Sequence, residues 1–248
     1  MVQCGYKVSE NTHDTEKSMG RVNIDMSVYP RKEHFEHFLA MENPFVSLTV
    51  QVDVTVWLRR LKAAGYPFFL CFQYAAVQAA NSVPEFRQRI ADGGIVMYDR
   101  CSPSWTVALP DGTYRYCTAN ADQTLEDYLT EAKAKQEAAL KDEHLTEEGD
   151  VLSQIFVSCV PWISYSGVTM PFPNREFSIP SLLWGKYHTE NYPVIIDGRL
   201  AEKENTTIPV TVLANHALVD GIHISAFFRN LSRELDRMEF PALTPQRT

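Results

Sequence analysis

Apolar side chains recur along the chain with the spacing of amphipathic helices. Phe35, Phe38 and Leu39 stand at i, i+3 and i+4, which places them on one helical face. The stretch that ends at Gly65 has the same spacing, and the stretch that follows Pro67 is apolar on nearly every face, as in a covered central helix. The pattern predicts helices over residues 31–41, 56–65, 67–82, 124–141 and 222–237.

Strands are predicted where the pattern changes to a period of two. Residues 46–55 alternate between apolar and polar side chains, as a strand with one buried face requires. Pro110 and Gly112 mark a chain reversal. We expect a meander in which residues 94–98 and 104–109 pair, and in which this reversal turns residues 104–109 into a hairpin with residues 113–117. The other predicted strands cover residues 113–117, 155–160, 163–168, 182–187, 192–196 and 208–214.

The order of these elements bears on the fold class and the domain organisation. Helices and strands alternate without a regular βαβ repeat, which favours an α/β fold with a mixed, largely antiparallel sheet and helices on one side. Residues 1–21 carry few apolar side chains, so we expect a flexible leader or an edge segment there. No linker or repeat divides the remainder, and residues 22–248 are expected to form a single domain.

The composition argues against several classes of protein. The 248 residues include 45% hydrophobic and 22% charged side chains, as in an ordinary globular protein with a core of normal size. Asp and Glu outnumber Lys and Arg by 31 to 23, and the net charge of −8 opposes binding to a nucleic-acid backbone. We therefore expect no nucleic-acid partner.

Neither membrane insertion nor secretion is expected. No stretch approaches the roughly 18 apolar residues of a membrane-spanning helix, and residues 1–20 lack the basic and apolar order of a signal peptide. The five cysteines are an odd number without a Cys-x-x-Cys pair, which is typical of free thiols in a reducing compartment. The sequence thus predicts a cytoplasmic protein without a membrane partner.

The segment over residues 210–223 holds the richest set of chemically useful side chains. A predicted buried strand ends in Asn215 and His216, Asp220 follows four residues after the histidine, and Gly221 precedes a predicted helix. Such a junction can present one side chain to a cleft. The structural alternative is a histidine satisfied within a turn, with Asp220 as the cap of the helix. The residues of this segment alone leave both interpretations open.

Segments elsewhere in the chain add a family resemblance. Residues 215–221 read Asn-His-Ala-Leu-Val-Asp-Gly and are similar to the His-His-Ala-x-x-Asp-Gly motif of the trimeric chloramphenicol acetyltransferase family. Further segments that are similar to the family, in the family's order, are residues 29–36, 48–55, 84–90, 157–165 and 185–187. Together these segments cover nearly the whole stretch from residue 22 to residue 235, so a chance match to the family is a poor explanation. The chain resembles this family over most of its length.

The resemblance implies a fold and an assembly. The fold is a two-layer CoA-dependent acyltransferase domain. It assembles as a homotrimer in which each active site lies at a subunit boundary, and acetyl-CoA and a small hydroxyl acceptor enter a tunnel from opposite ends. It also implies direct transfer, with His216 as general base, its Nδ1 proton held by its own backbone carbonyl and Nε2 free to act. Elementary chemistry agrees, because a hydroxyl is a weak nucleophile at neutral pH and imidazole titrates near it.

Three further catalytic residues are implied by the resemblance. Ser158 would stabilise the oxyanion of the tetrahedral intermediate, and such a donor is worth about 3 kcal/mol. An isolated strand serine would more simply bond to backbone, so only the resemblance singles it out. Asp220 would pair with Arg31, and this ion pair would support the surroundings of His216 rather than relay a proton.

The resemblance also assigns binding residues. Trp162 would lie beside the pantetheine arm of acetyl-CoA, with Lys186 and Tyr187 near its nucleotide end, where a cation suits phosphates and an aromatic face suits adenine. Taken singly, these would be a core tryptophan, a solvated lysine and a sheet tyrosine. Apolar candidates for the acceptor pocket are Val46, Tyr165, Val168, Met170 and Phe172.

The chain departs from the family pattern in three places. Asn215 replaces the first histidine of the motif, and residues 182–184 are apolar where the family usually has a threonine that orders a water molecule. An insertion between Tyr187 and Ile208 contains Asp197-Gly198, which predicts an added hairpin or loop. These departures concern the acceptor more than the donor. Acetyl-CoA-dependent O-acetyl transfer and chloramphenicol as acceptor are therefore separate predictions.

Two other catalytic interpretations are disfavoured. His216, Asp220 and His223 would need an unbroken helix to converge on a metal, and Gly221 interrupts them, so no metal is expected. A hydrolase triad of Ser158, His216 and Asp220 lacks a Gly-x-Ser-x-Gly elbow, and Asp220 would have to reach back around its own turn.

Two alternative functions remain. A same-fold acyltransferase with another alcohol or thiol acceptor is the enzymatic alternative. Its dihydrolipoyl form has an Asp-His-Arg-x-x-Asp-Gly motif with a lipoyl module and hinge, which this chain lacks. The second alternative is a non-catalytic binding relative that keeps the fold, which the changes at Asn215 and the missing threonine favour.

Overall fold

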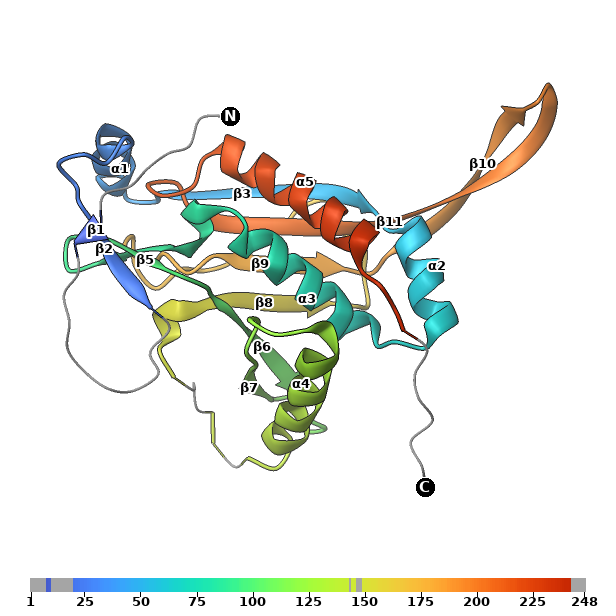
Figure 1. Ribbon diagram of the computed structural model, residues 1–248, viewed down its shortest axis with the longest axis horizontal. Coiled ribbons are helices and arrows are strands. Elements are labelled where there is room, and N and C mark those ends of the chain that lie inside the picture. The colour runs from blue at the N-terminus through green and yellow to red at the C-terminus, as the bar shows by residue number, and fades with distance from the viewer. Residues whose placement is uncertain (1–7, 10–19, 143, 146–148, 242–248) are drawn as a thin grey trace.

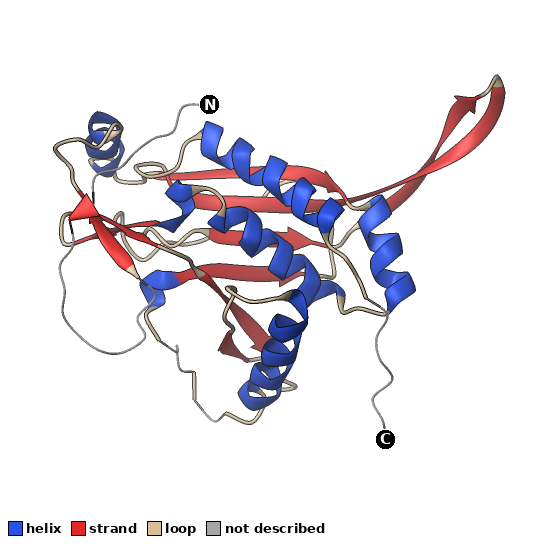
Figure 2. Ribbon diagram, in the orientation of Figure 1, coloured by secondary structure: helices blue, strands red, loops and turns tan. Residues whose placement is uncertain are grey.

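A mixed seven-stranded sheet forms one layer of the molecule, and helices cover one of its faces (Figures 1 and 2). The computed structural model describes residues 8–9, 20–142, 144–145 and 149–241. The strands are β3 (Phe45–Asp53), β6 (Ser102–Ala108), β7 (Tyr114–Thr118), β8 (Gln154–Val160), β9 (Ser181–Gly185), β10 (His188–Ile196) and β11 (Arg199–Asn215). The β6–β8 and β8–β9 pairs are parallel, and the other pairs are antiparallel. The predicted two-layer fold with a mixed, largely antiparallel sheet is confirmed.

The helical layer has a buried centre. The helices are α1 (Lys32–Leu39), α2 (Thr55–Ala64), α3 (Phe68–Asn81), α4 (Leu125–Ala139) and α5 (Gly221–Arg237), with short 3-10 helices at Pro84–Arg87 and Val151–Ser153. α3 and α5 lie side by side over the sheet (Figure 1). Phe72 and Ala76 of α3 are completely buried, as the apolar pattern predicted for a covered helix. α2 ends at Gly65, whose φ of 73° suits glycine at a helix end.

A second, small sheet lies apart from the main one. It consists of β1 (Val8–Ser9), β2 (Arg21–Ile24), β5 (Gly94–Tyr98) and β4 (Gln88–Ala91) in that order. β1 and the first residue of β2 fall within the segment expected to be a leader or edge, of which residues 1–7 and 10–19 lie outside the described residues. The sequence pattern did not predict β2 or β4. One core nevertheless joins both sheets and the helices, from Ile24 to Met238.

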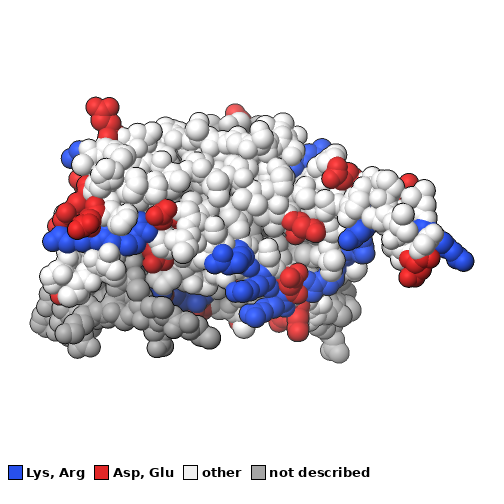
Figure 3. Space-filling view, turned by 90° about the horizontal axis from the view of Figure 1, so that it is seen from above, with Lys and Arg blue, Asp and Glu red and all other residues white. Residues whose placement is uncertain are grey.

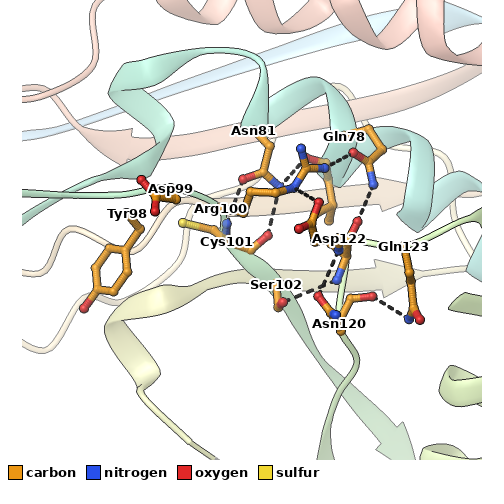
Figure 4. A network of polar contacts seen from close by, with 12 residues as sticks. Gln78, Asn81, Tyr98, Asp99, Arg100, Cys101, Ser102, Asn120, Asp122 and Gln123 are labelled. Atoms are coloured by element: carbon orange, nitrogen blue, oxygen red, sulfur yellow. Dashed lines mark hydrogen bonds and ion pairs between the residues drawn. The ribbon is translucent and has the colours of Figure 1, made fainter. Parts of the chain in front are cut away.

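The expected meander is wrong in one pairing. β5 pairs with β2 and β4, whereas β6 pairs with β7 and β8 in the main sheet. Between them, the Asn81 side chain of α3 bonds to both backbone groups of Cys101, accepting from its N–H at 2.7 Å and donating to its carbonyl at 2.8 Å (Figure 4). A side chain thus takes the position that a strand partner would have. The predicted hairpin of β6 and β7 is confirmed.

Residues 163–168 do not form the predicted strand. They belong to a long connection, residues 161–180, between the parallel strands β8 and β9. Parallel neighbours need a crossover, and this one passes over the sheet face opposite the helices. Its contacts with that face include Ser47 Oγ to the Val168 carbonyl at 3.4 Å and the Tyr165 hydroxyl to Thr211 Oγ1 at 3.3 Å.

The insertion before Ile208 forms the predicted hairpin. β10 and the first half of β11 pair from His188↔Thr207 to Ile196↔Arg199. Asp197 and Gly198 have φ values of 50° and 75°, the left-handed conformation of a type I′ turn. The hairpin projects beyond the body of the molecule and carries charges of both signs (Figures 1 and 3).

Candidate active site

His216 lies directly after β11, where the backbone is fixed on both sides. Its N–H donates to the Pro44 carbonyl at 2.7 Å, just ahead of β3. Its half-buried ring stacks on Phe38 of α1, with the ring centroids 3.9 Å apart and the planes inclined by 10°. The ring is therefore held between α1 and the end of the sheet.

Asn215 fixes the end of β11 from the opposite face. Its side chain is buried, and its amide nitrogen donates to the carbonyls of Arg175 at 2.8 Å and Phe177 at 3.0 Å. Its amide oxygen accepts the Ala217 N–H at 3.0 Å. The residue that replaces the first motif histidine thus ties the 161–180 connection to β11. Neutral histidine has one donor and one acceptor and could not make all three bonds.

The expected hydrogen bond from His216 Nδ1 to its own carbonyl is not formed. Nδ1 is buried and has no hydrogen-bonding partner within the described part of the chain. The ring plane is thus set by Phe38 and by the backbone, and no described acceptor fixes the tautomer.

Asp220 caps α5. Its Oδ1 accepts the Gly221 N–H at 2.6 Å, and this bond is the main cause that lowers the pKa of Asp220, with a smaller contribution from Arg31. The pair expected with Arg31 is present but long, since Nη1 and Oδ2 are 4.0 Å apart. His223 lies closer, with Nδ1 3.2 Å from Arg31 Nη1. His223 Nδ1 also accepts the Asp220 N–H at 2.8 Å and completes a capping box.

Ser158 does not lie beside His216 of the same chain. Ser158 is opposite Leu183 of β9, and Leu183 is opposite Thr211 of β11. His216 follows Thr211 by five residues, which is about 16 Å along the strand direction, and two further strand spacings separate β8 from β11. A hydrolase triad within one chain is therefore excluded. The apolar Leu183 is the cross-strand neighbour of Ser158, in the region where the family has its threonine.

The expected CoA residues gather at the Ser158 end of the sheet. The Lys186 N–H donates to the Ile163 carbonyl at 2.7 Å, which brings the turn holding Trp162 against the end of β9. This approach requires Gly185, because a Cβ there would stand 2.7 Å from that carbonyl oxygen. The Trp162 side chain is 76% exposed, as a residue available for binding must be.

Lys62 of α2 is a cation near this site that the sequence analysis did not identify. Its ammonium lies 5.2 Å from the centre of the Tyr187 ring, which also contacts Phe68 at 5.6 Å between centroids. A cation at this distance from an aromatic face is attracted to it. The tertiary fold brings Lys62 of α2 to Tyr187, and no local motif in the sequence indicates this contact.

Most of the expected acceptor residues lie on the sheet face opposite the helices, within the 161–180 connection that passes over it. Phe172 stacks on Phe45 with centroids 3.7 Å apart, and Val168 lines an open groove of about 430 Å³ along Ser47, Leu48 and Thr49. Val46 packs against the helix-covered core instead, because its side chain points to the other face of β3. The fold therefore separates Val46 from the other candidates.

The described residues contain no group of three His, Cys, Asp or Glu side chains that could hold a metal ion. The Nδ1 lone pair of His223 already accepts the Asp220 N–H. Over the same residues, no helix combines the length and apolar character needed to cross a bilayer.

The fold and the sequence around His216 place the protein among the CoA-dependent acyltransferases. A solved chloramphenicol acetyltransferase structure superposes with a TM-score of 0.67 at 27% identity and covers 87% of this chain and 100% of its own. A probable dihydrolipoamide acetyltransferase from Listeria monocytogenes superposes with a TM-score of 0.58 at 18% identity, over 86% of this chain and 97% of its own, which shows the shared fold.

Sequence comparisons narrow this class to one family. The family model for chloramphenicol acetyltransferase matches residues 19–232. Chloramphenicol acetyltransferase from Escherichia coli is 26% identical over 231 residues, which are 90% of this chain and 97% of the relative. The Clostridium perfringens enzyme is 26% identical over 212 residues, which are 84% and 95%. The chain belongs to the chloramphenicol acetyltransferase family and is an acyltransferase.

Proposed function

We propose that the protein transfers acetyl groups from acetyl-CoA directly to a hydroxyl of chloramphenicol or a chloramphenicol-like acceptor, with His216 as general base. The supporting observation is the placement of His216, whose half-buried ring is held by Phe38 and by the backbone bond to Pro44. A base held in this way can take the acceptor proton as the hydroxyl attacks the thioester. The reaction then needs no acyl-enzyme.

Each active site is formed between two copies of the chain. Support comes from the separation of His216 and Ser158. Each lies near the C-terminal end of its strand, and because β8 and β11 run in opposite directions, the two residues are at opposite ends of the sheet. Both expected catalytic groups can meet only if His216 of one protomer faces Ser158 of a neighbour. A homotrimer, as the family resemblance implies, closes three such sites. Ser158 then donates its hydroxyl to the oxyanion.

Acetyl-CoA enters at the Ser158 end. The exposed Trp162 lies beside the pantetheine arm, and Lys62, Lys186 and Tyr187 receive the nucleotide end. Cations at this end offset an overall charge of −8, which by itself would repel the CoA phosphates. The protein acts in the cytoplasm, as its predicted free thiols indicate.

The function is tested by release of free CoA thiol with acetyl-CoA and chloramphenicol. We expect turnover by the parent protein and a loss of several orders of magnitude in kcat for His216→Ala, with acetyl-CoA affinity unchanged because the base acts in the transition state. His34→Gln, which removes an exposed histidine of α1, should match the parent. Equal rates for parent and His216→Ala would refute the proposal.

Subunit complementation tests the shared site. His216→Ala and Ser158→Ala each impair every site of a pure trimer. A mixed trimer contains at least one site with His216 from one chain and Ser158 from the next. Co-expression of the two variants should therefore restore activity well above the sum of the two. Strict additivity would show that both groups act within one chain.

A different alcohol as natural acceptor is the second candidate. Leu183 opposite Ser158 favours it, because an apolar side chain cannot hold the water that the family's threonine orders. A panel of hydroxyl compounds in the same assay decides between acceptors by kcat/KM. Absence of turnover with every acceptor, together with acetyl-CoA binding, would indicate a non-catalytic relative.

A further inference from the structure

A second histidine, His223, lies in a cluster of charged side chains at the start of α5. Its side chain is 15% exposed, and Glu85, at 12%, faces it with a distance of 3.6 Å between Nε2 and Oε1. Arg31, just before α1, approaches with Nη1 3.2 Å from Nδ1 and 3.5 Å from Nε2. Residues from three separate parts of the sequence therefore meet at one imidazole.

The hydrogen bonds determine where the His223 proton is. The Asp220 backbone N–H can only donate, and its acceptor is Nδ1 at 2.8 Å. Nδ1 therefore carries a lone pair, and the proton of the neutral ring is on Nε2, which faces the Glu85 carboxylate. A doubly protonated ring would lose the bond from Asp220. The neutral Nε2–H form is the one that fits these contacts.

Burial of the ring favours this neutral form, although two carboxylates face it. Burial is the main cause that lowers the pKa of His223, and the Arg31 guanidinium lowers it further. The carboxylates of Glu85 and Asp220 oppose this effect, and the net direction is downward. At neutral pH the ring therefore stays uncharged.

The anchored backbone leads directly to His216. The N–H groups of Leu218 and Val219 donate to the Asn215 carbonyl at 3.1 and 2.9 Å. The next N–H, that of Asp220, is the one held by His223. The connection from His216 to α5 is thus a hydrogen-bonded turn with His223 at its far end.

We propose that neutral His223 is a positioning residue for acetyl transfer. It anchors the turn between His216 and α5 and keeps Arg31 beside Asp220, so that the His216 imidazole is held in its catalytic orientation. This inference rests on the role of His216 in the proposed function. Protonation of His223 breaks the anchor, so the acid side of the activity profile reports His223 in addition to His216. His223 itself touches neither substrate.

Two variants separate anchoring from the size of the side chain. His223→Gln keeps an acceptor for the Asp220 N–H and a donor for Glu85 but does not titrate. His223→Leu fills the space and offers neither. In the CoA-thiol assay at pH 7, we expect His223→Gln to keep kcat within about threefold of the parent. His223→Leu should lose about tenfold or more in kcat, with the KM values unchanged.

The pH profile gives a readout that a purely structural role would not move. Between pH 5 and 8 the parent kcat should fall on the acid side more steeply than one titrating group allows, whereas His223→Gln should follow a single group. His34→Gln, the control, should keep the parent profile. Parent kcat in His223→Leu, or an unchanged steepness in His223→Gln, would overturn the proposal. If His223→Leu does not fold, the profile of His223→Gln decides.

A measurement without turnover separates this inference from the proposed function. Long-range ¹H–¹⁵N NMR spectra of histidine-labelled protein at pH 7 distinguish the two tautomers, and His223→Gln assigns the signal. We expect Nε2–H for His223 and a displaced His216 signal in His223→Leu but not in His223→Gln. A charged or Nδ1–H His223, or an unmoved His216 signal, overturns the positioning role. These NMR results without acetyl transfer would instead refute the proposed function alone.

Discussion

Replacing Asn215 by alanine tests how the end of β11 is fixed. The variant loses two donated bonds, to the carbonyls of Arg175 and Phe177, and one accepted bond, from the Ala217 N–H, all between 2.8 and 3.0 Å. At about 1 kcal/mol for each buried bond, the loss is about 3 kcal/mol. For a chain of this size, 1 kcal/mol corresponds to about 2–4 °C, so the melting temperature should fall by about 6–12 °C.

The assay is thermal unfolding followed by circular dichroism at one subunit concentration, because association makes melting concentration-dependent. Asn230→Ala is the matched control: its amide donates one exposed bond to Ser82 Oγ and accepts a long, exposed one from Arg233 Nη1 at 3.4 Å, and its removal should cost within about 0.5 kcal/mol. Asn215→His, which restores the family residue, keeps at most one donor and one acceptor and should melt between the parent and Asn215→Ala. A melting temperature for Asn215→Ala within about 2 °C of the parent would contradict the assigned role.

Three further predictions concern packing, pH and thiols. Gly185→Ala puts a Cβ 2.7 Å from the Ile163 carbonyl oxygen, so we expect a loss of about 1–3 kcal/mol in chemical denaturation and weaker acetyl-CoA binding in calorimetry. Because the pKa of His223 is lowered in the folded chain, the unfolded chain binds more protons below about pH 6.5; stability in urea should therefore decrease from pH 7 to pH 5, and less so in His223→Gln. Burial raises the pKa of Cys71 to about 12 and of Cys159 to about 11, so both thiols should resist iodoacetamide at pH 8 until the protein is denatured, as mass spectrometry of the alkylated peptides will show.

The sequence predicted elements best where packing reinforces the local pattern. α3 is apolar all round because the sheet, α4 and α5 surround it, so its sequence indicated both a helix and a central position. Asp197-Gly198 predicted the added hairpin because both residues tolerate the left-handed backbone that the turn needs.

Strand partners were not contained in the local pattern. The alternation of residues 94–98 is the same whichever sheet receives them, and the small sheet is defined by β2 and β4, which are too short to give a clear signal. Residues 163–168 have the composition of a strand, yet the parallel order of β8 and β9 makes them part of a crossover.

In the candidate site too, a local motif indicated some residues, whereas only the tertiary structure shows how others are placed. The motif over residues 215–221 located His216 and Asp220, because these lie within one short segment. The distance between His216 and Ser158 follows from the strand order, and the contacts of Glu85 and Arg31 with His223 follow from tertiary packing. No spacing along the sequence reveals the His216–Ser158 distance or the contacts of His223.

The β10–β11 hairpin also has a consequence for evolution and engineering. Its ladder is regular up to the Asp197-Gly198 turn, and the pairing of β11 with β3 begins where that ladder ends, at Thr207. Residues gained or lost in opposite pairs therefore change the reach of the arm and leave every residue beneath it in register. During evolution the hairpin can therefore lengthen or shorten while the position of His216 stays the same. For engineering, the same turn is a place to graft a peptide or a fluorophore far from His216.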